Sequence, residues 1–320
     1  MSRSLARRHR AVVVGLGPMG QRHARVLAAL EERFALVGTF DVRAGVRAAA
    51  APVLASEEEA IDRADLVVVA TPNHAHAPTV VHALERGRHV LVEKPLCARA
   101  RDAEALVAAA SAGSSHLFVG HSERFNPVVR VIARLVRTEG VVAIDLSRVG
   151  PSRPTDCGVL LNLAVHDLDL AAYLGGGSAT VRGSVGRASV RASGEDAAHV
   201  LLSLASGGIG HVHVDRTVPE RSRTIVVATP RWIYEGDLLT HRLVRMCREL
   251  GARTEVPLPI DEPLVAQATA LADALDGGTP REIALAVDGA RAVALAEAAA
   301  LACSTAGPLS QPAGFRALPR

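Results

Sequence analysis

The sequence predicts an α/β protein with two domains: an N-terminal domain built on a doubly wound parallel sheet, and an α+β C-terminal domain with an open, mostly antiparallel sheet. Strand and helix patterns alternate over residues 1–120, which is typical of a parallel sheet with crossover helices. Strand patterns follow one another without helices over 180–228, which is typical of antiparallel pairing. We therefore expect domains at 1–120 and 121–320, with the C-terminal helix able to fold back onto the first domain.

Apolar runs and turn signals predict the individual elements. In the first domain, strands are expected at 11–14, 35–40, 65–70, 89–92 and 117–120, and helices at 78–86 and 99–110. Ser56 and Glu59 form a capping-box pattern that predicts a further short helix. In the second domain, strands are expected at 141–149, 180–190, 197–204, 208–216 and 224–228, and helices at 160–174, 262–275 and 284–301. Ser206-Gly207-Gly208 predicts a hairpin turn, and 308–320 an irregular tail.

Composition excludes several classes of function. Aromatic residues make up only 2% of the 320 residues, so stacking platforms for nucleic acid are not expected. The formal net charge of +3 is too small to imply a polyanionic partner. The four cysteines are widely spaced and form no CxxC or Cys/His cluster, so neither a metal site nor a disulfide framework is expected. Because the sequence shows neither a signal-peptide pattern nor an apolar run of membrane-spanning length, we expect a cytoplasmic protein.

The most informative motif is Gly15-Leu16-Gly17-Pro18-Met19-Gly20, which follows the apolar run 11–14 and begins a helix. In a dinucleotide-binding turn, the first glycine permits the tight bend, the second lets the backbone approach a pyrophosphate, and the third lets the helix pack closely. Pro18 is tolerated because the first N–H groups of a helix have no internal partner, and these groups attract phosphate. Asp41, at the end of the next strand, completes the pattern.

Asp41 and Arg43 favour different cofactors. Asp41 would accept hydrogen bonds from the ribose hydroxyls and repel a 2′-phosphate, which predicts NAD. Arg43 could hold such a phosphate, so NADP stays an alternative, although Arg43 also fits a solvated surface arginine.

Polar residues follow two neighbouring strands at the sheet edge where ligands bind. Thr71-Pro72-Asn73 follows one strand and Glu93-Lys94-Pro95 follows the next, so both segments, together with His76, are expected to contact the cofactor. Lys94 could donate a hydrogen bond to a substrate oxygen and stabilise negative charge there. The alternative is a surface ion pair between Glu93 and Lys94.

A second cluster of polar residues lies on the predicted helix 160–174. Asn162 and His166 are four residues apart and therefore share one helix face. A neutral imidazole takes up a proton near neutral pH, so His166 is the candidate general base, with a structural histidine as the alternative. Asp167 and Asp169 face elsewhere and are expected to bond to backbone or to neighbouring groups.

The passage between the domains carries further candidates. His121-Ser122-Glu123-Arg124-Phe125-Asn126-Pro127 supplies charged and amide groups to a cleft between domains, a common place for ligands. Arg124, Arg148 and Arg153 could bind an anionic substrate through bidentate hydrogen bonds, and ion pairing at the domain interface is an equally good alternative. The expected substrate-binding residues are Lys94, His121, Glu123, Arg124, Asn126, Arg148, Asn162 and His166.

Several of these motifs resemble the Gfo/Idh/MocA family of sugar and inositol dehydrogenases. They are the glycine turn, TPNHAH at 71–76, EKP at 93–95 and GVLLNLAVHDLDLAAYL at 158–174. GHSERFNPVVR at 120–130 and RVGP at 148–151 are most similar to the members that act on C3 of UDP-N-acetylglucosamine. The resemblance implies a Rossmann domain, an open antiparallel sheet, homodimers or homotetramers formed through that sheet, and a cis peptide bond before Pro95.

One position departs from the family pattern. Asn162 stands where the family usually has aspartate, and an amide can orient groups but cannot take up a proton. Because Lys94 and His166 are both present, catalysis is still expected, with a slower reaction, an altered substrate or a changed direction left open.

The motifs and the resemblance together predict an NAD(P)-dependent dehydrogenase that oxidises a sugar hydroxyl to a ketone, or catalyses the reverse reaction. The leading substrate is C3 of a nucleotide-linked sugar such as UDP-N-acetylglucosamine, and the expected catalytic residues are Lys94, His166 and Asn162. One alternative is a ketosugar reductase or inositol-type dehydrogenase of a specialised pathway. The other is an NAD(H)-binding sensor or assembly protein with impaired catalysis, which Asn162 would support.

Overall fold

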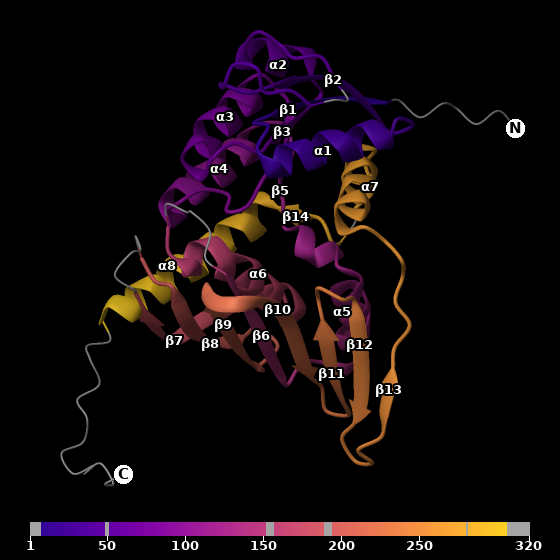
Figure 1. Ribbon diagram of the computed structural model, residues 1–320, viewed down its shortest axis with the longest axis vertical. Coiled ribbons are helices and arrows are strands. Elements are labelled where there is room, and N and C mark those ends of the chain that lie inside the picture. Colours follow the sequence, from indigo (N-terminus) through magenta and orange to yellow (C-terminus); the bar gives the residue numbers. More distant parts are fainter. Residues whose placement is uncertain (1–7, 49–50, 152–156, 189–193, 280, 306–320) are drawn as a thin grey trace, which may run out of the picture.

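The computed structural model describes residues 8–48, 51–151, 157–188, 194–279 and 281–305. Within these ranges, a six-stranded sheet A and an eight-stranded sheet B occupy opposite ends of the molecule (Figure 1). Sheet A is mostly parallel and sheet B is mostly antiparallel, so the predicted fold class is confirmed. Arg153 and the predicted tail at 308–320 lie outside the described residues.

Sheet A has the strand order β2-β1-β3-β4-β5-β14. Its parallel strands are β1 (His9–Val14), β2 (Phe34–Phe40), β3 (Leu66–Val69), β4 (His89–Val92) and β5 (Leu117–Val119). The chain leaves β1 in one direction to form β2 and returns to form β3 on the other side, so the end of β1 is a topological switch point. Sequence patterns predicted β5 as the last strand, but β14 (Ala284–Leu285) pairs antiparallel with β5 beyond it.

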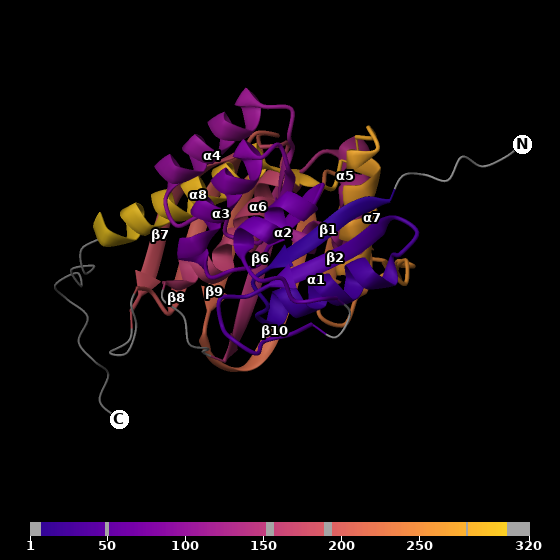
Figure 2. The ribbon, with the colours of Figure 1, turned by 90° about the horizontal axis from the view of Figure 1, so that it is seen from above.

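The helices of the first domain cover both faces of sheet A (Figure 2). They are α1 (Pro18–Ala29), α2 (Glu57–Arg63), α3 (Asn73–Glu85) and α4 (Ala100–Ala112). Val13 and Val68 point to the side of α1 and of α7 (Pro263–Leu275), whereas Val12 and Val67 point to the side of α2, α3 and α4. Helix α3 begins five residues earlier than predicted, because Pro78 is accommodated inside the helix rather than at its start.

The predicted capping box is present at α2. The N–H of Glu59 donates to the Ser56 hydroxyl at 3.1 Å, and the Glu59 carboxylate accepts from the N–H of Ala55 at 2.8 Å. The first of these bonds satisfies an orphan N–H group at the start of this seven-residue helix, and the second ties the preceding Ala55 to it.

Sheet B has the strand order β13-β12-β11-β10-β6-β9-β8-β7. Its strands are β6 (Ala143–Pro151), β7 (Ala179–Arg187), β8 (Ala197–Leu204), β9 (Ile209–Asp215), β10 (Thr217–Ala228), β11 (Trp232–Asp237), β12 (Arg242–Cys247) and β13 (Arg253–Glu255). The pair β6–β9 is parallel, and the hairpin turn at 206–208 joins β8 to β9 as predicted. Strands β11 to β13 were not predicted, and β10 begins seven residues before the predicted 224–228.

The remaining helices join the two sheets. The short 3₁₀ helix η1 (Ser122–Phe125), α5 (Pro127–Glu139), a π-helical turn η2 (Leu160–Ala164) and α6 (Val165–Leu174) follow the first domain. Sequence patterns missed α5, and they merged β14 with α8 (Ala286–Thr305) into one helix at 284–301. Helix α8 packs against α4 of the first domain and against α6 and β7 of the second, and it crosses between the domains in Figure 1. Among the described helices, none combines the length and apolar character needed to cross a membrane.

The outer face of sheet B carries exposed apolar side chains. Val185, Leu201 and Ile209 are each more than half exposed. The expectation that copies of the chain associate through this sheet stays a prediction.

Candidate active site

The glycine turn joins β1 to α1 at the switch point of sheet A. Gly15 has a φ of +90°, and a side chain there would collide with main-chain atoms of Ala70 and Thr71. A Cβ on Gly20 would overlap the carbonyl oxygen of Gly15, whereas one on Gly17 would meet nothing within 4 Å. Within the described chain, no side chain caps the N-terminus of α1. The turn thus presents open space and free N–H groups to a ligand, which fits the pyrophosphate of a dinucleotide.

Asp41 lies beside this turn and is already hydrogen-bonded. Its Oδ2 accepts from the N–H of Leu16 at 2.7 Å and from Nη2 of Arg43 at 2.9 Å, and its Oδ1 accepts from Nε and the N–H of Arg43. The hydrogen bond from the Arg43 side chain, followed by those from the two N–H groups, holds the pKa of Asp41 well below its usual range. Arg43 is 62% exposed, so ribose hydroxyls could replace its guanidinium while the Leu16 contact stays in place.

The segments after β3 and β4 meet at one edge of sheet A. The buried ring of His76 lies between two main-chain carbonyls, with Nδ1 2.8 Å from the oxygen of Pro95 and Nε2 2.9 Å from that of Thr71. The predicted positions 71–73 and 93–95 are therefore adjacent. The peptide bond between Lys94 and Pro95 is cis, as the family resemblance implied.

Lys94 reaches from this edge into the second domain. Its Nζ donates to the main-chain oxygen of Asn162 at 3.1 Å, and burial lowers the pKa of Lys94 although Glu93 acts in the opposite direction. Glu93 is buried, and its Oε1 lies 2.7 Å from Nε2 of His23 in α1. The alternative of a surface Glu93–Lys94 ion pair is therefore wrong, because Glu93 pairs with His23 inside the protein.

Asn162 and His166 lie where the π-helical turn passes into α6. Such turns are rare and are frequently found at functional sites. Burial lowers the pKa of His166 well below its ordinary value, and the charges of Lys94 and Arg148 act in the same direction. Nδ1 of His166 has no hydrogen-bond partner in the described part of the chain. His166 is therefore a neutral imidazole at neutral pH, which is the form that accepts a proton.

A cavity of about 670 Å³ lies between the two domains. Its lining comes from α1 and the segment after β4 in the first domain, and from β6, η2 and β10 in the second. The residues predicted from the sequence that line it are Met19, Glu93, Lys94, Glu123, Asn126, Arg148, Asn162 and His166. The structure thus brings the candidate acid–base residues, the glycine-turn helix and part of the predicted substrate site to one place.

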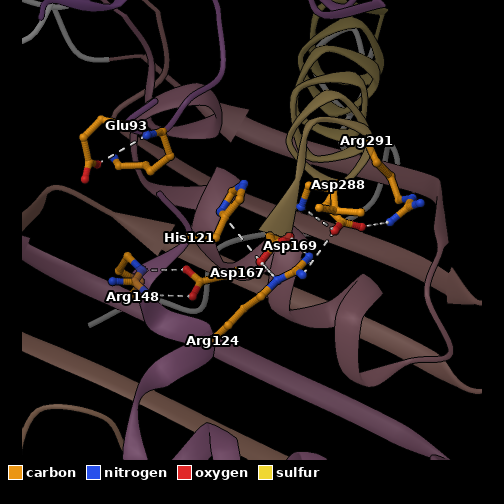
Figure 3. Close-up of polar contacts among 10 residues, drawn as sticks. Glu93, His121, Arg124, Arg148, Asp167, Asp169, Asp288 and Arg291 are labelled. Atoms are coloured by element: carbon orange, nitrogen blue, oxygen red, sulfur yellow. Dashed lines mark hydrogen bonds and ion pairs between the residues drawn. The ribbon is translucent and has the colours of Figure 1, made fainter. Parts of the chain in front are cut away.

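Arg124 does not line this cavity, and its placement corrects the prediction that it binds an anionic substrate. Its Nε and Nη2 donate to Asp169 at 2.8 and 2.5 Å, and its Nη1 donates to Asp288 at 3.3 Å (Figure 3). The guanidinium also lies 4.7 Å from the ring centroid of Tyr173. Arg124 is 3% exposed and connects η1 to α6 and α8, so it forms an internal ion pair and not a substrate contact.

Arg148 lines the cavity, but its bidentate fork is occupied. Nε and Nη2 donate to the two oxygens of Asp167 at 2.8 and 2.9 Å (Figure 3). Nη1 donates to Glu123 at 3.0 Å. Burial opposes the charge of Arg148, but the carboxylates of Asp167 and Glu123 outweigh it and raise the pKa of the guanidinium. The prediction of bidentate substrate binding by Arg148 is corrected for this reason, and Asp167 is the neighbour-bonded residue that the sequence indicated.

Two further candidates from the predicted substrate site are His121 and Asn126. His121 is 2% exposed and does not line the cavity, and within the described chain neither of its ring nitrogens has a hydrogen-bond partner. Its Nδ1 lies 3.6 Å from Asp169, beyond a good hydrogen bond. Asn126 lines the cavity, but its Oδ1 caps α5 by accepting from Val128 N–H and its Nδ2 donates to the main-chain oxygen of Leu238. Asn126 therefore holds structure at the cavity wall, whereas His121 lies buried outside the lining.

Sequence reasoning missed several cavity residues. They are Arg22 and Arg25 on α1, Arg221 and Arg223 on β10, His241 and Glu262. The positions on α1 had a usable signal, because they follow the glycine turn within two helical turns. The positions on β10 had none, because the first half of that strand was not predicted.

The first domain is a Rossmann domain with an open phosphate-binding turn. The second domain closes a cavity over the carboxyl ends of the strands of sheet A. This arrangement defines the class of the protein as an NAD-binding oxidoreductase. The family "Oxidoreductase family, NAD-binding Rossmann fold" matches residues 9–121, and the "GFO/IDH/MocA C-terminal domain" matches residues 101–233. The chain belongs to the GFO/IDH/MocA family, as the sequence motifs predicted.

Individual relatives support this assignment. The UDP-N-acetylglucosamine 3-dehydrogenase of Acidithiobacillus ferrooxidans is 29% identical over 266 residues, which cover 79% of this chain and 82% of the relative. A solved structure of that dehydrogenase has a TM-score of 0.84 at 27% identity, covering 92% of this chain and 97% of that chain. The structure of GenD2 from gentamicin A biosynthesis, in complex with NAD, has a TM-score of 0.80 at 25% identity and covers 95% and 97%. The scyllo-inositol 2-dehydrogenase (NAD(+)) of Bacillus subtilis is 26% identical over 77% of this chain and 79% of its own.

Proposed function

We propose that the protein oxidises a secondary hydroxyl of a nucleotide-linked sugar, with C3 of UDP-N-acetylglucosamine as the leading substrate, or reduces the corresponding ketone. The observation that carries this proposal is the meeting of Lys94 and His166 in the cavity between the domains. The similarity to UDP-N-acetylglucosamine 3-dehydrogenase over most of the chain supports the choice of sugar.

The roles of the residues follow from their charge states. His166 is neutral and lines the cavity, so it can take the hydroxyl proton as the C–O bond becomes C=O. Lys94 donates a hydrogen bond to the same oxygen and stabilises the negative charge that develops there. Bound NAD would supply the nicotinamide carbon that receives the hydride. The glycine turn and Asp41 would hold the dinucleotide with that ring toward the cavity.

Asn162 stands where the family usually has aspartate, but the site still has a proton acceptor in His166. Its main-chain oxygen holds Nζ of Lys94, and its side chain lines the cavity four residues from His166. The amide would orient the substrate or His166, while His166 alone takes up the proton. The hypothesis that the protein is an enzyme is therefore better supported than the hypothesis that it binds the cofactor without catalysis.

A substrate panel tests the proposal. Purified protein with NAD or NADP would be given UDP-N-acetylglucosamine, UDP-glucose, scyllo-inositol, myo-inositol and levoglucosan, and the reduction of the cofactor would be followed by absorbance. We expect the highest kcat/KM with a UDP-linked sugar. A higher kcat/KM with an inositol would overturn the choice of substrate and favour an inositol-type dehydrogenase. Silence with the whole panel, while NADH still binds, would favour the binding role.

A further inference from the structure

The cavity between the domains is unbalanced in charge. Among the described residues that line it, seven are arginine or lysine and three are carboxylates. All three carboxylates are already paired. Glu93 contacts His23, Glu123 accepts from arginines of β6 and β10, and Glu262 pairs with Arg25. The negative charges of the lining therefore leave part of the positive charge uncompensated.

Most of the arginines that line the cavity are also paired with carboxylates. Arg148 holds Asp167 and Glu123, Arg223 shares Glu123, and Arg216 holds Asp196. These groups are committed to ion pairs that position the walls of the cavity. They leave few free donors for a ligand.

Arg22 and Arg221 differ from the other arginines of the lining. Both are exposed, and neither forms an ion pair with any residue that the structure describes. The contact made by the Arg22 guanidinium is a weak one, 3.8 Å to the sulfur of Met19. Two guanidinium groups with all or nearly all of their donors available thus border a cavity that already has a positive surplus.

The two arginines come from different domains. Arg22 lies on α1, two residues beyond the last glycine of the glycine turn. Arg221 lies on β10 where its pairing with β6 is irregular, and a Cβ on Gly150 would lie 3.0 Å from Cγ of Arg221. Gly150 therefore leaves room for the Arg221 stem to cross β6 at the wall of the cavity.

We propose that Arg22 and Arg221 form an anion-binding subsite that holds the diphosphate of a nucleotide-linked substrate, while Lys94 and His166 hold the reacting sugar hydroxyl. This inference rests on the proposed function and names the recognition residues for it. Guanidinium groups bind phosphate oxygens through paired, charge-assisted hydrogen bonds, and an uncompensated positive cleft concentrates anions. The subsite takes the place of Arg124 and Arg148, whose donors are used inside the protein.

Titration calorimetry of UDP into the full chain with NADH bound tests this subsite. The variants are Arg22→Gln and Arg221→Gln, and Arg101→Gln is the matched control, since Arg101 is 73% exposed on α4 and does not line the cavity. We expect the Kd for UDP to rise about tenfold or more in each test variant, as for loss of a charge-assisted hydrogen bond, and to stay unchanged in the control. The thermal unfolding midpoint of each NADH complex checks that the variants are folded.

Two results would overturn the inference: no binding of UDP to the native protein, or equal binding to native protein and both test variants. The measurement is independent of turnover. If UDP binding requires both arginines but no UDP-linked sugar reduces NAD, the proposed function fails and the subsite stands. If UDP-N-acetylglucosamine is oxidised with an unchanged KM in Arg22→Gln and Arg221→Gln, the subsite fails and the function stands.

Discussion

Two groups of charged residues lie side by side in this protein and are used in opposite ways. Around Arg124, every charge has a partner: Asp169 and Asp288 accept from the guanidinium, and Arg291 pairs with Asp288. In the cavity, Lys94 contacts a neutral main-chain oxygen and the half-buried His166 stays uncharged. The comparison teaches that a charged side chain paired with another inside the protein stabilises the fold, whereas one without such a partner is available for chemistry. The residue type alone does not distinguish the two.

The physical reason is the cost of burial. A buried charge without a partner loses several kcal/mol of hydration, and partners in good geometry recover most of that cost. Arg124, Asp169, Asp288 and Arg291 recover this cost by pairing with one another within the protein. Lys94 and His166 have no such partner among the described residues, so they can interact with a substrate oxygen instead. A site built in this way is complementary to the charge that develops on that oxygen.

The comparison predicts its largest effect at Lys94. Replacing Lys94 with Met removes the donor to the reacting oxygen, so kcat should fall by about 10²–10⁴-fold. The free energy of unfolding should stay the same or rise, because a partly buried ammonium is removed. Steady-state kinetics and urea unfolding measure the two quantities. A kcat within a few-fold of native would show that Lys94 belongs with the structural charges.

Arg124→Met should show the reverse pattern. Removing this guanidinium leaves the buried Asp169 without its guanidinium partner, while Asp288 keeps Arg291, so the free energy of unfolding should fall by about 3–5 kcal/mol. The Kd values of the folded protein for NADH and UDP should change little, because Arg124 does not line the cavity. Urea unfolding together with titration calorimetry gives both numbers, and Asp169→Asn is the partner variant. A stability loss below 1 kcal/mol would contradict the role assigned to this ion pair.

Sequence patterns predicted much of the fold because its signals are local. The glycine turn, the apolar strands and the capping box each lie within a few residues, and the structure contains all of them. The roles of the arginines could not be predicted in this way. Arg124 pairs with residues 45 and 164 positions away, so its sequence neighbourhood does not show that it is already paired. Arg221 sits on a strand half that carries mostly exposed, polar residues and gives no strand pattern.

Asp41 and Arg43 form an intermediate case, an ion pair that a ligand would open. Asp41→Ser should raise the Kd for NAD about tenfold through the lost hydrogen bonds to ribose, whereas Arg43→Ala should leave the Kd unchanged or lower it, since Arg43 competes for the carboxylate. Fluorescence titration with NADH checks both. Tighter binding of NADPH than of NADH by the native protein would contradict the preference for NAD.

The smallest predicted effect comes from Asn162→Asp, which adds an unpaired carboxylate to the cavity. In Asn162→Asp, a new carboxylate near Lys94 and His166 favours their charged forms and so raises the pKa of both. His166 must be neutral to take up a proton, and its pKa is depressed in the native protein, so activity should be lost only well below pH 6.5. The variant should lose activity at a higher pH than native protein does.

The pH dependence of kcat/KM measures this shift, and Asn162→Ala is the control, because it keeps the main-chain oxygen that holds Lys94. We expect the acidic limb of Asn162→Ala to coincide with that of native protein. An acidic limb that stays in place in Asn162→Asp would mean that His166 is not the group that titrates. A large gain of activity in Asn162→Asp would instead show that the native site is impaired.

The most direct test of the central claim follows the hydrogen itself. The protein would be incubated with NAD and UDP-N-acetylglucosamine deuterated at C3, and mass spectrometry would locate the deuterium in the products. Our account predicts reduced cofactor that carries the deuterium and a UDP-linked 3-ketosugar that has lost it, with transfer in Lys94→Met slower by about 10²–10⁴-fold. Deuterium that remains on the sugar, with the cofactor unreduced, would contradict the claim that this cavity oxidises C3 of a nucleotide-linked sugar.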